Sequence, residues 1–241
     1  MHRSAPRHRL APRLLAFAAV PVMLVVAGCS SDSGSGSSSK TSSPTASASK
    51  SASPTAAAAA FAKLPEDACK SISAKTVEDL VPSVKTKAGT ADKSTDIELR
   101  SGCNWNGLKS NGTKGSDYRW LGVSYLRFPS DATLGDGAKR ATDQYAKEVT
   151  KAQATEGAKN VKTAATSGIG DQATTVTYTL RKTDADFTYA TVVVRTENVV
   201  AIVDYNGAGY EGAKSPSVDD VTKGAQTAAK EAVAAVATAN K

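Results

Sequence analysis

The chain has very little histidine: among its 241 residues only His2 and His8 occur. Both lie in the first 28 residues, which have the features of a signal peptide described below. Without histidine, the rest of the chain cannot form Ser-His-Asp or Cys-His catalytic sites, or a zinc site built on imidazole. We therefore expect a protein that is not an enzyme, with no cofactor and no metal site.

The chain also lacks a strong charge once its first residues are set aside. Its 30 basic and 23 acidic residues give a formal net charge of +7. Four of the arginines (Arg3, Arg7, Arg9 and Arg13) lie within residues 1–28, so 26 basic residues remain against 23 acidic ones, a balance of +3. No cluster of Lys and Arg stands out in this remainder. The composition therefore predicts no nucleic-acid partner.

Cysteine is scarce, and the first of the three cysteines follows three small or aliphatic residues, Val26, Ala27 and Gly28. Bacterial lipoprotein signal peptidase recognises this pattern and cleaves before the cysteine. The arginines and an apolar segment over 14–26, shorter than the roughly 20 residues of a membrane span, complete a signal peptide. We expect residues 1–28 to be removed and a lipid-modified Cys29 to anchor the protein on the extracytoplasmic face of the cell membrane. The alternatives are an uncleaved anchor or a plain secretory peptide.

Cys69 and Cys103 remain as an even pair in an oxidising compartment, where disulfides form and persist. A disulfide across a loop of this length contributes about 3–4 kcal/mol in the chain-entropy model. The alternative is two free thiols with a redox or metal role, although the sequence has no CxxC spacing. We predict the disulfide.

Residues 30–60 are nearly all Ser, Ala, Thr, Gly and Pro, a composition that cannot bury enough apolar surface to fold. We expect 29–61 to be the lipidated cysteine and a disordered tether, either bare or glycosylated. Residues 62–241 have the length of one extracellular domain.

Hydrophobic patterns in this domain predict an α+β fold. We expect helical turns over 67–72 and 73–81, a loop or weak edge strand over 85–101, strands over 103–108, 119–128, 174–180, 187–195 and 199–205, a helix over 137–154, and a last helix beginning at 215–216. This order favours an antiparallel sheet with helices packed on one face. Residues 168–173 match a GxGxxA dinucleotide motif, but they precede a strand and not a helix, so we interpret them as a turn.

Aromatic residues make up only 5% of the chain and concentrate in its middle strands. Packing in the core is their usual role. Alternatively, Trp105, Trp120 and Tyr125 line a ligand groove, since ligand sites are often aromatic.

Three short motifs together resemble a known family. Cys69 near the start of the domain, Cys103-Asn104-Trp105, and residues 168–173 followed by strands are similar to an uncharacterised (domain-of-unknown-function) family of small actinobacterial cell-envelope lipoproteins with a C…CxW pattern. The resemblance covers most of residues 64–210. It implies a lipid anchor, a polar tether and one α+β domain, and it carries over no catalytic residues.

These observations predict a membrane-anchored extracellular lipoprotein that serves as a non-enzymatic binding or interaction module of the cell envelope, with an envelope protein or wall component as its partner. The alternative is a carrier or sensor of a small apolar ligand, such as a lipid, in a cleft near Trp105 and Trp120. A third hypothesis is a hydrolase that uses two carboxylates.

Overall fold

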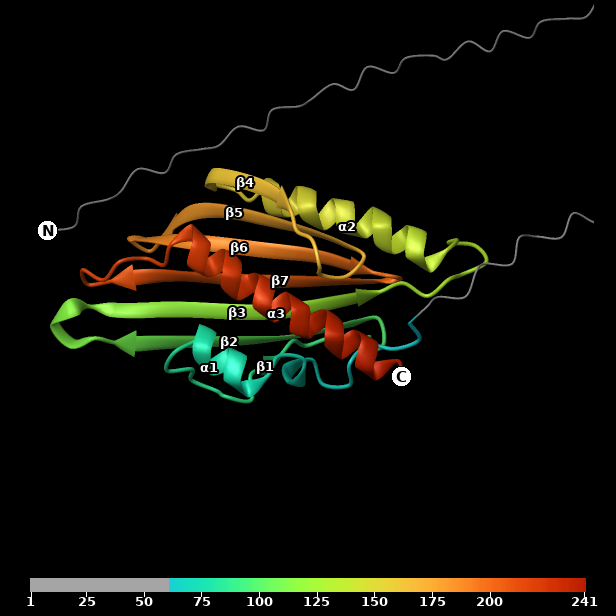
Figure 1. Cartoon of the computed structure of the whole chain (residues 1–241), viewed down its shortest axis with the longest axis horizontal. Helices are drawn as coiled ribbons and strands as arrows, with labels where there is room; N and C mark the ends of the chain where they lie inside the picture. The colour runs from blue at the N-terminus through green and yellow to red at the C-terminus, as the bar shows by residue number, and fades with distance from the viewer. Residues whose placement is uncertain (1–60) are drawn as a thin grey trace, which may run out of the picture. The chain divides into compact units, whose positions relative to one another are not determined.

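Seven strands form one antiparallel sheet in the order β1-β2-β3-β7-β6-β5-β4 (Figure 1). The computed structural model describes residues 61–241. The predicted signal peptide, Cys29 and the tether before Phe61 lie outside the described residues and stay predictions. The strands are β1 (Thr90–Ala91), β2 (Arg100–Ser110), β3 (Ser116–Arg127), β4 (Lys159–Ala165), β5 (Gln172–Lys182), β6 (Ala185–Thr196) and β7 (Val199–Tyr210).

One face of the sheet is covered by α3 (Val218–Ala239), with α1 (Ala74–Leu80) and the short helix η1 (Ala68–Lys70) beside it. Alternate residues of β3, β6 and β7 point toward α3, among them Leu121, Val192 and Val203, each fully buried. The side of α3 against them is mostly alanine, so the helix lies close to the sheet. Burial of each large aliphatic side chain here stabilises the fold by about 1.5–3 kcal/mol.

The opposite face carries α2 (Gly137–Gln153), which covers only part of the sheet. Ala141 and Tyr145 of α2 pack on Val193, Val200 and Ile202, the strand residues whose side chains point away from α3. The α+β class, the antiparallel sheet and the single disulfide are thus as predicted. The helices, however, are divided between the two faces, because β6 and β7 are apolar on both sides.

Two further elements differ from the sequence-based expectation. Strand β4 was not predicted, because all seven of its residues are exposed and it has no hydrophobic alternation. Helix α3 begins at Val218 and not at 215–216. Ser217 is its N-cap: its hydroxyl accepts a hydrogen bond from the Asp220 backbone, and the Asp220 side chain accepts one from the Ser217 backbone.

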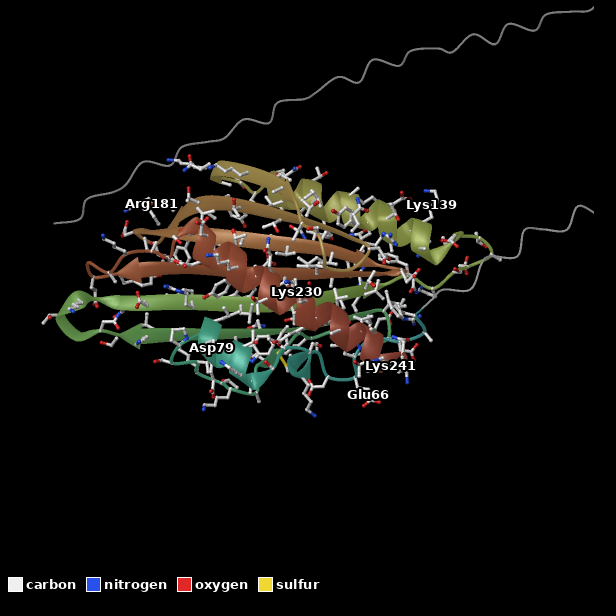
Figure 2. All side chains as sticks on the ribbon, viewed as in Figure 1. Glu66, Asp79, Lys139, Arg181, Lys230 and Lys241 are labelled. Carbon is white, nitrogen blue, oxygen red and sulfur yellow. A yellow bond between two sulfur atoms is a disulfide. The ribbon has the colours of Figure 1, made fainter. Side chains whose placement is uncertain are left out.

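The predicted disulfide joins Cys69 to Cys103 and ties η1 to β2 (Figure 2). The two Cα atoms are 5.0 Å apart and the cysteines are separated by 34 positions in sequence. Cys103 is buried in the core on the side of the sheet that carries α3 and η1. The bond therefore fixes the start of the domain to the edge of the sheet that is farthest from α2.

The described chain begins at one end of the sheet, where two asparagines hold it. The side chain of Asn198, in the β6–β7 turn, accepts a hydrogen bond from the Phe61 amide and donates to the carbonyl oxygens of Phe61 and Phe128. Asn240, at the end of α3, accepts from the amides of Ala62 and Lys63. Arg181 and Lys241 lie toward opposite ends of the sheet (Figure 2). None of the helices between residues 61 and 241 is long and apolar enough to cross a membrane.

Candidate functional site

The three aromatic residues predicted to line a groove do not lie together. Trp105 and Tyr125 are core residues on the side of the sheet that carries α3, with 2% and 1% of their surface exposed. The Trp105 Nε1 donates to the Lys87 carbonyl oxygen at 3.3 Å, and the Tyr125 hydroxyl donates to the Ala232 carbonyl oxygen at 3.3 Å. Burial raises the pKa of Tyr125 far above its usual value. Both side chains therefore have structural roles.

Trp120 lies on the other face of the sheet. The register pairs Trp105 with Leu121, and Leu121 is buried beneath α3, so Trp120, the next residue on β3, points away from α3. A cleft shared by Trp105 and Trp120 is therefore wrong, because the sheet itself separates the two rings. Of the three predicted groove residues, only Trp120 lines a hollow on the surface.

That hollow, which we call the aromatic groove, lies on the α2 face of the sheet, beyond the part that α2 covers. Its volume is about 610 Å³, within the range of pockets that hold small molecules. It is lined by six aromatic and three polar side chains: Tyr118, Trp120, Tyr178, Phe187, Tyr189, Tyr210, Lys182, Asp204 and Asn206.

The aromatic rings of the groove pack against one another. Tyr178 and Tyr189 stack face to face, with ring centroids 4.7 Å apart and planes 8° apart. Tyr118 and Tyr210 meet Phe187 edge to face, at 5.8 Å and 6.4 Å between centroids. Such arrangements are favourable and hold the side chains in fixed positions. The groove is therefore largely formed before any ligand arrives.

A second depression, the inner hollow, continues from the groove toward α2. It has a volume of about 440 Å³ and shares Tyr178 and Asp204 with the groove. Its charged side chains include Arg100 of β2 and Glu148 and Lys151 of α2. Asp204 therefore lies where the aromatic groove meets a more polar space.

Asp204 is a partly buried carboxylate with few partners. The Thr191 hydroxyl donates a hydrogen bond to its Oδ1, while no Lys or Arg of the described residues forms an ion pair with it. Burial raises its pKa above the usual aspartate value; the hydrogen bond from Thr191 and the charge of Lys151 oppose this effect. Asp204 can thus accept a further hydrogen bond from a group that enters the groove.

Asn206 is the most informative polar residue of the groove. The residue as a whole is 5% exposed, and its side-chain amide makes no hydrogen bond within residues 61–241. Neither amide atom is among the fully buried, unpaired side-chain atoms of these residues, so the amide is open to the groove. Each Asn206 amide atom can bind a ligand without first breaking a hydrogen bond within the protein.

Sequence reasoning missed Asp204 and Asn206, although β7 carries a signal for them. Residues 199–203 are apolar at every position, as in a strand covered on both faces. The next two positions facing away from α3, Asp204 and Asn206, are polar, while Tyr205 remains in the core. This change from apolar to polar residues marks the point on β7 beyond which α2 no longer packs over the sheet.

A third hollow, of about 640 Å³, lies between residues 63–73 and the last turns of α3. Its main carboxylate already has partners. Glu231 accepts hydrogen bonds from the Ser73 backbone at 2.7 Å and from the Thr76 hydroxyl at 2.6 Å. The lining of this hollow contains no aromatic side chain. The aromatic groove is therefore the better candidate site.

Comparison with known proteins gives distant likenesses. No protein-family model and no curated protein matches the chain. Among solved structures, LpqN, involved in cell envelope biogenesis of Mycobacterium tuberculosis, is 15% identical, with 61% of this chain and 82% of that chain covered and a TM-score of 0.29. A Bacteroides thetaiotaomicron protein is 12% identical, with 61% and 47% covered and a TM-score of 0.27. The lipid transfer and protein localization domain of human StarD13 is 10% identical, with 64% and 89% covered and a TM-score of 0.19. Scores this low do not bear on function.

Proposed function

We propose that this chain is a lipid-anchored binding protein of the cell envelope and that its aromatic groove holds a small ligand. The observation that carries the proposal is the Asn206 amide, which makes no hydrogen bond within residues 61–241 and lines a preformed aromatic groove. A ligand can pair with this amide and cover the aromatic rings without disrupting a hydrogen bond of the fold. We therefore propose the aromatic groove as the binding site, and not a cleft between Trp105 and Trp120.

A binding role fits the groove better than catalysis by two carboxylates. Glu148 and Asp204 both line the inner hollow. The Glu148 carboxylate is engaged, because it accepts a hydrogen bond from Gln144 at 2.7 Å and pairs with Lys151 at 3.6 Å. A hydrolase would need both carboxylates directed at the same substrate bond. We therefore propose that the protein is not an enzyme.

We propose further that Cys29 carries the lipid anchor and that the chain belongs with the actinobacterial lipoproteins it resembles. The small residues Val26–Gly28 before Cys29 support this. The described chain starts beside Asn198, at the start of β7, whereas the rim of the groove includes Tyr210, at its end. A strand of 12 residues spans about 40 Å. The rim of the groove and the first described residue therefore lie toward opposite ends of β7.

The ligand is tested by native mass spectrometry of the full chain purified from an actinobacterial host. We expect wild type to carry an additional non-covalent mass, and the Asn206→Leu variant to lose it while remaining folded. Leu134→Ala, at an exposed loop position far from the groove, serves as the control and should keep the mass. An identical bound mass in wild type and Asn206→Leu would refute the groove as the site.

The anchor is tested separately by cell fractionation. Cys29→Ala should leave an unprocessed precursor or release the protein from the membrane, since a lipid cannot attach. Correct cleavage and unchanged membrane retention in this variant would contradict the lipoprotein assignment without affecting the groove.

A further inference from the structure

We propose that the groove ligand is a carbohydrate, with one sugar ring lying on the Trp120 indole and its hydroxyls bonded to Asp204 and Asn206. This inference rests on the proposed function and names the chemical class of its ligand. It follows from how one aromatic ring and two polar side chains are placed on adjacent strands.

The Trp120 indole lies flat along β3 because Gly122 has no side chain. A Cβ atom built on Gly122 would come within 2.3 Å of the Trp120 Cη2 and within 2.9 Å of its Cζ3. The ring therefore covers the backbone at Gly122 with one side. Trp120 is partly exposed and lines the groove, so its other side is open to a ligand.

The two polar side chains are the direct neighbours of this ring. In the β3–β7 register Asn206 is the partner of Trp120, and Asp204 is the partner of Gly122. Partners in antiparallel strands have Cα atoms about 4.5–5.5 Å apart. A carboxylate and an amide thus lie along one edge of a flat aromatic platform.

A sugar ring can pack on the Trp120 indole and also form hydrogen bonds with Asp204 and Asn206. Its C–H face is apolar enough to pack on an indole, while its hydroxyls project sideways as donors and acceptors. Asp204 can accept from hydroxyls, and the Asn206 amide can both donate and accept. The Tyr178 and Tyr189 rings offer no second platform between them, because they stack on each other and Lys182 Nζ lies 5.3 Å from the Tyr189 ring centroid. Trp120 is therefore the ring that we assign as the platform for a sugar.

An acyl chain fits less well. Its methylene groups would remove water from the Asp204 carboxylate and the Asn206 amide without forming any hydrogen bond to them, which is unfavourable. The groove is also lined by aromatic rings separated by polar side chains and not by a continuous aliphatic wall.

The test is binding of the full chain, held in lipid nanodiscs, to an array of immobilised neutral oligosaccharides built from hexoses, pentoses and amino sugars. We expect wild type to bind a subset of the array. Asn206→Ala and Asp204→Asn should each weaken binding about tenfold, the effect of one lost hydrogen bond. Trp120→Phe, which keeps a smaller aromatic ring, should weaken binding several-fold, and Leu134→Ala should leave it unchanged.

Failure of this inference is distinguishable from failure of the proposed function. Absence of binding anywhere on the array, together with a bound mass in native spectra that is not a carbohydrate and is lost in Asn206→Leu, would overturn the sugar assignment and keep the groove. Unchanged array binding in all three groove variants would mean that sugars bind outside the groove. This result would also overturn the sugar assignment. Absence of any ligand in both experiments would overturn both proposals.

Discussion

Asn198 and Asn206 are both buried asparagines of the β6–β7 hairpin, but only Asn198 has hydrogen-bond partners among the described residues. Asn198 is fully buried and bonds the backbone of Phe61 and Phe128. Asn206 is 5% exposed and faces the aromatic groove without a partner. The same residue type thus has a structural role at one end of β7 and an unfilled hydrogen-bonding capacity toward the other.

This contrast predicts unequal effects of the same substitution. Asn206→Leu should change the free energy of unfolding by less than about 0.5 kcal/mol, because the Asn206 side chain makes no hydrogen bond within residues 61–241. Asn198→Leu should lower it by about 2 kcal/mol or more, since three hydrogen bonds are lost and backbone groups stay unpaired. Urea unfolding of both variants measures the difference. A destabilised Asn206→Leu would mean that the amide already has a partner in solution.

The raised pKa of Asp204 leads us to expect that the stability of the fold depends on pH. Because burial raises its folded-state pKa, the folded protein favours the protonated carboxyl. Wild type should therefore lose stability relative to Asp204→Asn as the pH rises from below the pKa of an unfolded aspartate, near 4, through the folded pKa. Melting temperatures of the two proteins between pH 3 and pH 8 give this difference directly.

The comparison with Asp204→Asn is needed because other carboxylates act in the opposite direction. Hydrogen bonds from Leu134 and Thr133 lower the pKa of Asp131, and those from Ser217 lower the pKa of Asp220. Their contributions are present in both proteins and cancel in the difference. A difference that grows in favour of wild type with rising pH would contradict the assigned shift.

The disulfide predicts a large loss of stability on removal. Replacing both Cys69 and Cys103 by alanine should lower the free energy of unfolding by about 3–4 kcal/mol, as expected for a loop closed across 34 positions. Chemical unfolding of this double variant beside wild type measures it. A loss below about 1 kcal/mol would mean that the contacts of η1 alone hold the start of the domain.

Gly122 predicts a loss of binding without a loss of fold. In Gly122→Ala the new methyl group would overlap the Trp120 ring, so the indole must leave its flat position on β3. We expect ligand affinity to fall about tenfold or more, with a changed tryptophan emission spectrum. Leu134→Ala, at an exposed loop position outside both hollows, is the control and should change neither. Unaltered affinity in Gly122→Ala would remove Trp120 from the site.

Much of the fold could be predicted because strong local patterns specify it. The alternation in β5, the helical spacing in α2 and the even pair of cysteines each correspond to an element that the structure contains. Strand β4 could not be predicted, since an exposed edge strand carries no hydrophobic pattern. Which face of the sheet each helix covers depends on tertiary packing. Local sequence patterns do not show it.

The site was harder to predict than the fold because it depends on register. Trp105 and Trp120 are both strand aromatics, and only the pairing of β2 with β3 reveals that they face opposite sides. Asp204 and Asn206 become significant once α2 is known to stop short of them. Trp120 lines a hollow on the surface, whereas Trp105 and Tyr125, the two residues predicted to lie beside it, are buried in the core.

The most direct test of the ligand groove is a crystal structure of the protein purified with its bound ligand. We expect ligand density over Trp120, with a polar atom of the ligand within hydrogen-bond distance of the Asn206 amide. Ligand density in the hollow between α3 and residues 63–73, with only ordered water beside Asn206, would contradict it.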